Sequence, residues 1–272
     1  MLIDSHCHLD FEDFAHDRDE VLKAAQINGV SAFIIPAVCA ANFDKIIRLA
    51  QLDSSLYYAL GLHPCFMDQH QLDFNHLDHV DTLDKFLEHN INSKSLVAIG
   101  ECGLDFFINE AAHNLEAQEL QLLLFKAQLK LAQKYKLPLI IHARKALDRI
   151  IYEIKKCKDP SLKGVIHSFS GSMVQMEQVI ALGFYCSFGG PITYPRSTKL
   201  QQLVKNIPLD KILLESDSPD QLNYSPIYPR QDTRNTPSSI VQVCQTIAAI
   251  KEIPFKDIAA QTSFNARCLF GI

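Results

Sequence analysis

The feature that most constrains the fold is a regular alternation of short apolar runs and amphipathic stretches along almost the whole 272-residue chain. Apolar residues that recur every three or four positions predict helices, and short continuous apolar runs predict buried strands. The clearest helical pattern is Glu116–Lys136, which Pro138 terminates. Eight runs have the character of parallel strands: Leu2–His6, Ser31–Pro36, Tyr57–Leu62, Leu96–Gly100, Leu139–His142, Val165–His167, Phe184–Phe188 and Ile212–Glu215.

Strands that alternate with helices imply right-handed βαβ units and a parallel sheet. The length suits a TIM (β/α)8 barrel, which usually has about 250 residues, although length alone also permits two smaller domains. An open doubly wound sheet would concentrate its site at one switch point, whereas ligand-type residues end five different strands here. No repeat or linker divides the sequence. We therefore expect one α/β barrel domain over residues 1–272.

Composition and charge narrow the class of protein. A hydrophobic fraction of 47% supports a packed core, and a net charge of -5 argues against nucleic-acid binding through a broad basic surface. It does not exclude a nucleic-acid enzyme, because bound divalent metals add positive charge. The eight cysteines form no CxxC pair, which predicts reduced core thiols. With neither an export signal nor a transmembrane segment, the sequence predicts a cytoplasmic protein without membrane contact.

Six potential metal ligands lie at or just after predicted strand ends: His6, His8, Glu101, His142, His167 and Asp217. In an α/β barrel these ends converge on the face where catalytic residues collect. His6 and His8 are two positions apart, so their side chains share one face while Cys7 points to the other. An isolated HxH motif is more often a buried histidine pair than a metal site. The joint occurrence of all six residues favours a metal site.

Further roles follow from residue chemistry. Glu101 can bridge two metals, and Asp217 can bind a metal, accept a proton from the bridging water, or do both. His63, in GLHP, is a candidate phosphate contact, and the planar fork of Arg144 suits an anionic group. Two nearby carboxylates are expected to support these side chains rather than to bind metal: Asp105 and Glu215.

Other polar residues carry weaker signals. The late loops Pro195–Arg196 and Tyr224–Asn235 are predicted on the catalytic face. Their arginines could guide a substrate backbone, but loop arginines are usually only solvated: Arg196, Arg230 and Arg234. The remaining histidines lie in helical or polar loop segments and are predicted at the surface: His16, His70, His76, His79, His89 and His113. Motifs for a nucleophile elbow, a Walker loop or a dinucleotide fold are absent from the sequence.

Seven motifs occur in a fixed order: DSHCHLD, GLHP, IGECGLDF, LPLIIHAR, HSFSGS, SFGGPITYPRSTKL and LLESDSPD. With these motifs the chain resembles the TatD family of metal-dependent deoxyribonucleases over essentially its full length, and GPITYPRSTKL and DSPD resemble its YjjV-like branch. The resemblance implies an amidohydrolase-type barrel with two metals. It implies the following ligands: His6, His8 and Asp217 for the first metal, His142 and His167 for the second, and Glu101 as the bridge. It also places His63 and Arg144 near the bound phosphate, and Ser216 stands where family members commonly have Thr.

The leading hypothesis is exonuclease-like hydrolysis of DNA phosphodiester bonds by a two-metal-activated water. The expected partner is single-stranded DNA or a strand end, and the protein is expected to be a monomer. The mixed nitrogen and oxygen donors admit zinc, magnesium, manganese or nickel. An alternative keeps the metals but cleaves small phosphoesters, amides or lactones on the same barrel. A non-catalytic binding protein would have lost at least one ligand position, and all six are present.

Overall fold

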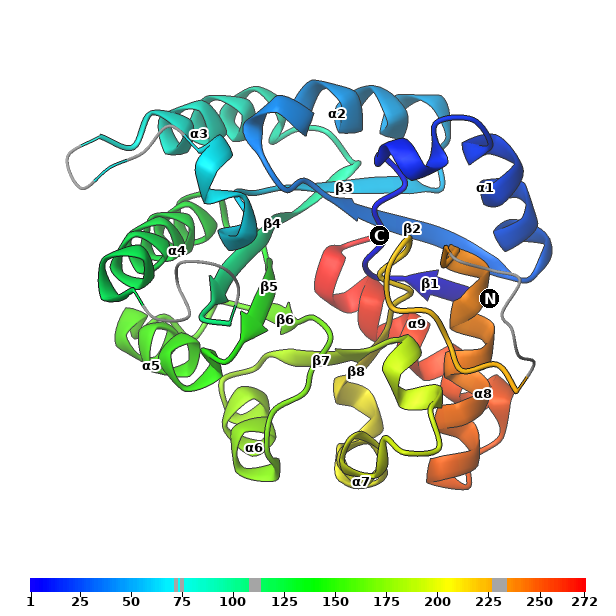
Figure 1. Cartoon of the computed structure of the whole chain (residues 1–272). Coiled ribbons are helices and arrows are strands. Elements are labelled where there is room, and N and C mark those ends of the chain that lie inside the picture. Colours follow the sequence, from blue (N-terminus) through cyan, green and yellow to red (C-terminus); the bar gives the residue numbers. More distant parts are fainter. Residues whose placement is uncertain (71–72, 74–75, 108–113, 227–233) are drawn as a thin grey trace.

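The computed structural model describes residues 1–70, 73, 76–107, 114–226 and 234–272. Eight parallel strands follow one another in sequence order and form a nearly closed barrel (Figure 1). The strands are β1 Leu2–Asp4, β2 Val30–Pro36, β3 Leu56–Leu60, β4 Leu96–Asp105, β5 Leu139–Arg144, β6 Gly164–Ile166, β7 Tyr185–Phe188 and β8 Ile212–Leu214. The predicted TIM (β/α)8 barrel is therefore confirmed.

Helices connect the strands and surround them (Figure 1). The α-helices are α1 Arg18–Ile27, α2 Phe43–Leu52, α3 Asp78–Asn90, α4 Leu115–Tyr135, α5 Leu147–Cys157, α6 Met173–Ala181, α7 Thr198–Asn206, α8 Ile240–Lys251 and α9 Phe255–Phe270. The 3-10 turns are η1 Glu12–Phe14, η2 Ala40–Asn42, η3 Pro64–Gln69, η5 Gly190–Thr193, η6 Leu209–Lys211 and η7 Pro237–Ser239. The predicted helix Glu116–Lys136 corresponds to α4, which ends where Lys136 adopts a left-handed conformation with φ 55°.

The core consists of two apolar clusters on opposite faces of the strands. In β2, Phe33 and Ile35 belong to the larger cluster, whereas Ile34 belongs to the smaller one. Because side chains alternate along a strand, the larger cluster faces the outer helices and the smaller one fills the barrel. Leu269 and Phe270 of α9 complete the inner cluster, and α9 packs against β1 and β8. The polar residues of the mouth thus lie above a packed apolar interior.

The junction between β8 and β1 is reinforced by residues just beyond the two strands. The Asp217 amide donates to the His6 carbonyl at 2.9 Å, and the His8 amide donates to the Ser218 carbonyl at 2.8 Å. These hydrogen bonds tie the segment that follows β1 to the segment that follows β8. Two widely separated motifs of the sequence are thereby fixed side by side at the barrel mouth.

Several strand ends differ from the prediction. β1 ends at Asp4, so His6 and His8 lie in the segment after the strand rather than within it or at its end. β4 continues to Asp105, so Glu101 lies inside this strand and not at its end. The ladder between β4 and β5 shifts register between Ile99 and Cys102. Such a bulge forms only through pairing with the neighbouring strand. The apolar pattern of a single segment therefore ended the predicted β4 at Gly100.

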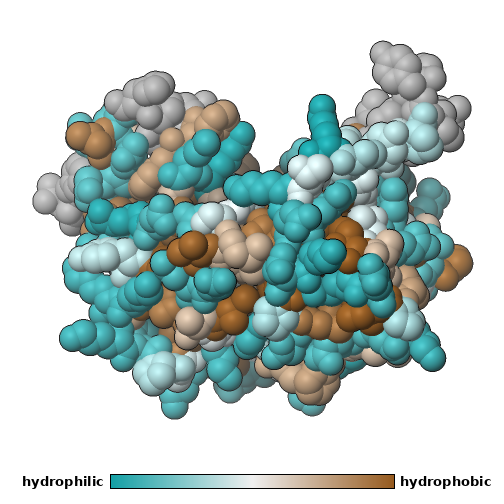
Figure 2. Space-filling view, turned by 90° about the horizontal axis from the view of Figure 1, so that it is seen from below, coloured by the Kyte–Doolittle hydropathy of each residue, from teal (hydrophilic) through white to brown (hydrophobic). Residues whose placement is uncertain are grey.

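All eight cysteines are free thiols, and most are buried, as the sequence predicted. Within the described residues, no helix combines the length and apolarity that crossing a bilayer requires. On the side of the molecule drawn in Figure 2, hydrophobic residues lie interspersed with hydrophilic ones.

Candidate metal centre

The barrel mouth contains a cavity of about 370 Å³, and seven of the eight predicted site residues line it: His8, His63, Glu101, His142, Arg144, His167 and Asp217. The eighth, His6, lies directly behind, with its Nε2 atom 3.1 Å from Nε2 of His8. The His6 ring also stacks on the His167 ring, with centroids 4.2 Å apart. Residues scattered over more than two hundred positions therefore meet at one place.

One group of donors comes from the segments that directly follow β1 and β8. Asp217 Oδ1 lies 3.4 Å from His6 Nε2 and 3.8 Å from His8 Nε2. Cys7 points away, as alternation predicted, with its Sγ 3.7 Å from the Ile34 carbonyl oxygen in the core. His6, His8 and Asp217 form a group whose ligand atoms lie within 4.8 Å of one another.

A second group comes from β5 and the end of β6. His142 Nδ1 lies 3.2 Å from His167 Nε2. Glu101 Oε1 is 3.2 Å from His142 Nδ1 and 2.9 Å from His167 Nε2. The other oxygen of Glu101, Oε2, is 3.2 Å from His6 Nε2 and 3.7 Å from His8 Nε2. One buried carboxylate therefore contacts both groups of imidazoles, one oxygen to each.

Two further carboxylates lie behind the second group, and one of them is hydrogen-bonded to it. Asp105 Oδ2 lies 2.9 Å from His142 Nε2, so Nε2 donates to Asp105, and Nδ1 is the ring nitrogen that faces Glu101 and the cavity. Glu215 Oε1 lies 3.7 Å from His167 Nδ1. Glu215 is itself fixed, accepting from the Ser168 amide at 2.7 Å and the Ser187 hydroxyl at 2.5 Å. These contacts fit the supporting role expected of Asp105 and Glu215, which stays a prediction, because Glu215 also forms a possible metal-binding group with His6 and His167.

Asp217 is held by a residue that the sequence did not indicate. Gln221 Nε2 donates to Asp217 Oδ2 at 2.5 Å. Asp217 has a left-handed backbone with φ 52°, a conformation that is uncommon outside glycine and often found at functional sites. Asn235 donates to the Ser216 carbonyl at 2.8 Å and thereby fixes the same turn. No strand or helix pattern marks Gln221, because its role depends on the path of this turn.

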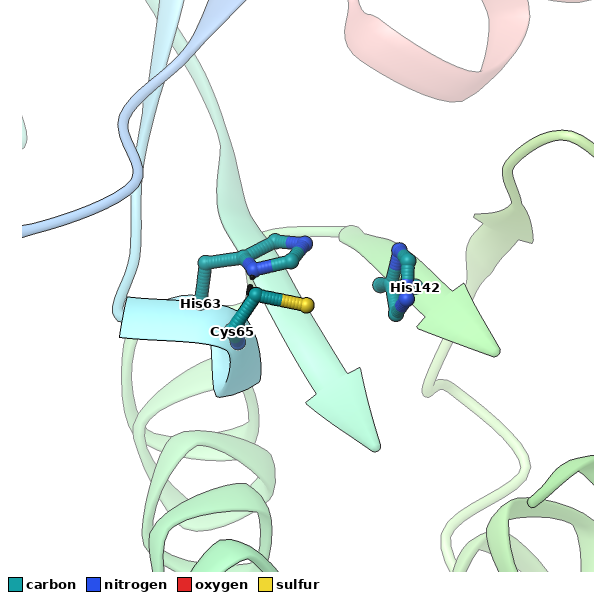
Figure 3. Close-up of side chains that lie close together, drawn as sticks. All are labelled: His63, Cys65 and His142. Carbon is teal, nitrogen blue, oxygen red and sulfur yellow. Dashed lines mark hydrogen bonds between the residues drawn. The ribbon is translucent and has the colours of Figure 1, made fainter. Parts of the chain in front are cut away.

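His63 and Cys65 follow β3, and their side chains lie beside His142 (Figure 3). The His63 and His142 ring centroids are 4.5 Å apart. His63 Nδ1 accepts from the Cys65 amide at 3.0 Å, so its proton lies on Nε2, which donates to Glu101 Oε1 at 2.9 Å. Burial and the Asp105 carboxylate raise the pKa of the Cys65 thiol, so the thiol stays protonated. Cys65 was not identified from the sequence as a site residue, although it lies two positions after His63.

The charge distribution of the cavity favours a bound cation. Burial opposes ionisation of Glu101, yet the imidazoles of His63 and His167 outweigh it and hold the Glu101 pKa well below its ordinary value. Burial also opposes protonation of His142, but its hydrogen bonds to Asp105 and Glu101 raise its pKa. The carboxylates thus attract positive charge. A divalent cation can supply this charge when it displaces the protons of the imidazoles. The mixed nitrogen and oxygen donors suit such an ion.

Some peripheral predictions need correction. His70 is buried rather than exposed, because η3 folds its Nε2 to within 2.9 Å of the His63 carbonyl oxygen. Arg234, for which substrate guidance and simple solvation were both open, is ion-paired with Asp17 at 2.6 Å. Arg230, His113 and part of the loop Tyr224–Asn235 lie outside the described residues.

An α/β barrel with clustered histidines and carboxylates at its mouth belongs to the class of metal-dependent hydrolases. The family model described as "TatD related DNase" matches residues 3–271, and the chain belongs to this TatD family of metal-dependent hydrolases. It is 36% identical over 270 residues to the "Uncharacterized metal-dependent hydrolase YjjV" of Escherichia coli, covering 99% of this chain and 98% of that protein. The crystal structure of YjjV matches with a TM-score of 0.88 and 35% identity, covering 100% of this chain and 98% of that one.

A relative with a more specific name is the "3'-5' ssDNA/RNA exonuclease TatD" of Erwinia amylovora. It is 34% identical over 275 residues, which cover 100% of both chains.

Proposed function

We propose that the protein hydrolyses phosphodiester bonds of single-stranded DNA, acting from a strand end with two divalent cations. The observation that carries this proposal is the position of Glu101. Its two carboxylate oxygens contact separate imidazole groups, the arrangement that a ligand shared by two ions requires. The family membership and the exonuclease name of a 34% identical relative support it.

The proposed ligands divide between two ions: His6, His8 and Asp217 for one, His142 and His167 for the other, and Glu101 for both. When bound, such ions supply Lewis acidity and a water of lowered pKa. The protein's part is to hold the donors in place, and Asp105, Glu215 and Gln221 do this through the contacts described above.

Asp217 is the proposed proton acceptor for the attacking water. Its carboxylate lies in the lining of the cavity, with Oδ1 toward His6 and Oδ2 held by Gln221. A fixed carboxylate beside the reacting water removes the proton as the bond to phosphorus forms. Glu101 contributes by fixing both imidazole groups relative to this carboxylate.

Two donors are proposed to bind the phosphate. His63 carries its proton on Nε2, which donates to Glu101 Oε1 in the structure. With Glu101 bound to cations, this N–H is proposed to donate to a phosphate oxygen instead. Arg144 lines the same cavity, and its Cζ atom lies 4.0 Å from the centroid of the Phe107 ring, which fixes the guanidinium plane. A planar guanidinium can donate two parallel hydrogen bonds to a phosphate.

The direct test uses metal-depleted protein, single-stranded DNA labelled at one end, and added magnesium, manganese or zinc. Asp217→Asn is the matched control, because it removes the proton acceptor and keeps the side-chain size. The proposal predicts metal-dependent shortening that the control variant lacks. Intact DNA under every metal, together with turnover of a small phosphoester, amide or lactone, would assign the same site to small substrates.

A further inference from the structure

A second hollow adjoins the metal cavity between α5 and α6. It has a volume of about 670 Å³ and shares Ala143, Arg144 and Ser170 with the lining of the metal cavity. We call it the α5–α6 groove, and its polar lining includes Arg144, Lys145, Arg149, Ser170, Ser172 and Lys199. A molecule bound at the metal cavity can therefore extend into this groove.

The α5–α6 groove is cationic although the chain as a whole carries a net charge of -5. Four basic side chains line it against one acidic side chain, Asp148, whose Oδ1 accepts from Gln175 at 2.7 Å. Arg149 is ion-paired with Glu153 at 2.9 Å. Among the described residues, the other three cations form no salt bridge: Arg144, Lys145 and Lys199. The groove thus retains an excess of positive charge.

Lys199 lies where the groove meets the metal cavity. Its Nζ donates to the carbonyl oxygen of Ser170 at 3.2 Å, and Ser170 lines both hollows. Lys145 directly follows Arg144, the proposed phosphate donor of the metal cavity. The cations therefore continue from the proposed scissile phosphate toward α6.

The opposite wall of the metal cavity has a different character. Phe11, Val38 and Phe66 line it from the loops after β1, β2 and β3, across the mouth from β5 and β6. Aromatic rings of this kind suit a base of single-stranded DNA, whereas cations suit its backbone. We therefore expect a DNA strand with one nucleotide in the metal cavity to continue into the α5–α6 groove.

We propose that the α5–α6 groove binds the phosphates that neighbour the scissile one, so that the preferred substrate is a single-stranded polynucleotide and not a mononucleotide-sized ester. This inference rests on the proposed function and adds a binding site for the phosphates beside the scissile one. Lys145 and Lys199 are the residues that provide the preference, because they lie in the groove and outside the lining of the metal cavity.

The test is the double variant Lys145→Gln/Lys199→Gln, assayed with its metals on an oligothymidylate of about twelve nucleotides and on bis(4-nitrophenyl) phosphate. We expect kcat/KM for the oligonucleotide to fall about tenfold at low salt and that for the small ester to change less than about twofold. Each phosphate contact on a single strand contributes about 0.7 to the slope of log affinity against log salt. Loss of two contacts should therefore reduce that slope by about 1.4, measured by fluorescence anisotropy with a phosphorothioate oligonucleotide.

The matched control is Lys94→Gln/Lys163→Gln, because both lysines are exposed and precede β4 and β6 at the opposite end of the barrel. This control should retain wild-type activity on the oligonucleotide and the wild-type salt slope. Equal behaviour of the two double variants would overturn the groove proposal while leaving the nuclease intact. A wild-type protein that cleaves the small ester and no oligonucleotide would overturn the proposed function itself, and the groove proposal with it.

Discussion

The two halves of the metal centre are supported in different ways. In the β5/β6 half, formed by His142 and His167, the second ring nitrogens face buried carboxylates at 2.9 and 3.7 Å. In the β1/β8 half, formed by His6, His8 and Asp217, the Nδ1 atoms of both histidines are buried without a hydrogen-bond partner among the described residues. His167 Nδ1 also has no hydrogen-bond partner there, so the ring that a carboxylate holds by a hydrogen bond is that of His142. One half thus has its carboxylates behind the imidazoles, whereas the other has a carboxylate beside them.

The position of the carboxylates determines whether their negative charge affects the imidazoles or the bound ion in each half. A carboxylate behind a ligating imidazole fixes the ring and raises its basicity, so its loss weakens metal binding indirectly. A carboxylate beside the imidazoles acts on the ion and on the substrate water directly. Glu101 lies between the halves and contacts an imidazole of each, at 3.2 Å from His6 Nε2 and from His142 Nδ1. Substitutions in the two halves should therefore differ in size and in kind.

The largest effect is expected from Glu101→Ala, which removes the contact common to both halves. Turnover of DNA should fall at least about 1000-fold, since losing several kcal/mol of metal-derived stabilisation corresponds to such a factor. The measurement is kcat on single-stranded DNA, with circular dichroism to show that the barrel remains folded. Near-normal turnover by a folded variant would exclude a bridging role.

Asp217→Asn should come next, because it affects only the β1/β8 half but removes its carboxylate. We expect kcat to fall about 100- to 1000-fold through loss of the proton acceptor, while the β5/β6 half keeps its ion. Elemental analysis of the purified variant should then show about one strongly held ion per chain. Loss of both ions in this variant would show that the two halves do not bind their ions independently.

A smaller effect is expected from Asp105→Asn, which changes only the support of His142. Affinity for one of the two ions should fall about 10- to 100-fold, as is typical for second partners of metal-binding histidines. Asp84→Asn is a suitable control, because Asp84 pairs with Lys134 on the outer helices. Competition with a chelator of known affinity measures the change in metal affinity. An unaltered affinity would mean that the β5/β6 half does not need Asp105 to hold His142.

The smallest effect is expected from Arg144→Ala, which lies outside both halves. KM for DNA should rise about tenfold while the metal content stays at the wild-type value, because the guanidinium is proposed to bind phosphate rather than the ions. Arg144→Lys should recover part of the loss. A fall in metal content would instead place Arg144 in the support of the metal centre.

The sequence predicted the barrel and the convergence of the site residues, since both follow from periodicity. His142 is an example, because it lies near the carboxyl end of an apolar run and such ends meet at the barrel mouth. The position of Glu101 inside β4 was not predictable, because the bulge exists only through pairing with β5. Gln221 and Cys65 act through turns, and His70 is buried by the fold of η3, which no single-segment pattern encodes.

The most direct test of the central claim is a calorimetric titration of metal-depleted protein with manganese or zinc, comparing the wild type with Glu101→Ala. We expect about two ions per wild-type chain and weakened binding of both ions in the variant, because one oxygen of Glu101 faces each half. A single ion per wild-type chain, or two ions bound by the variant with wild-type affinity, would contradict it.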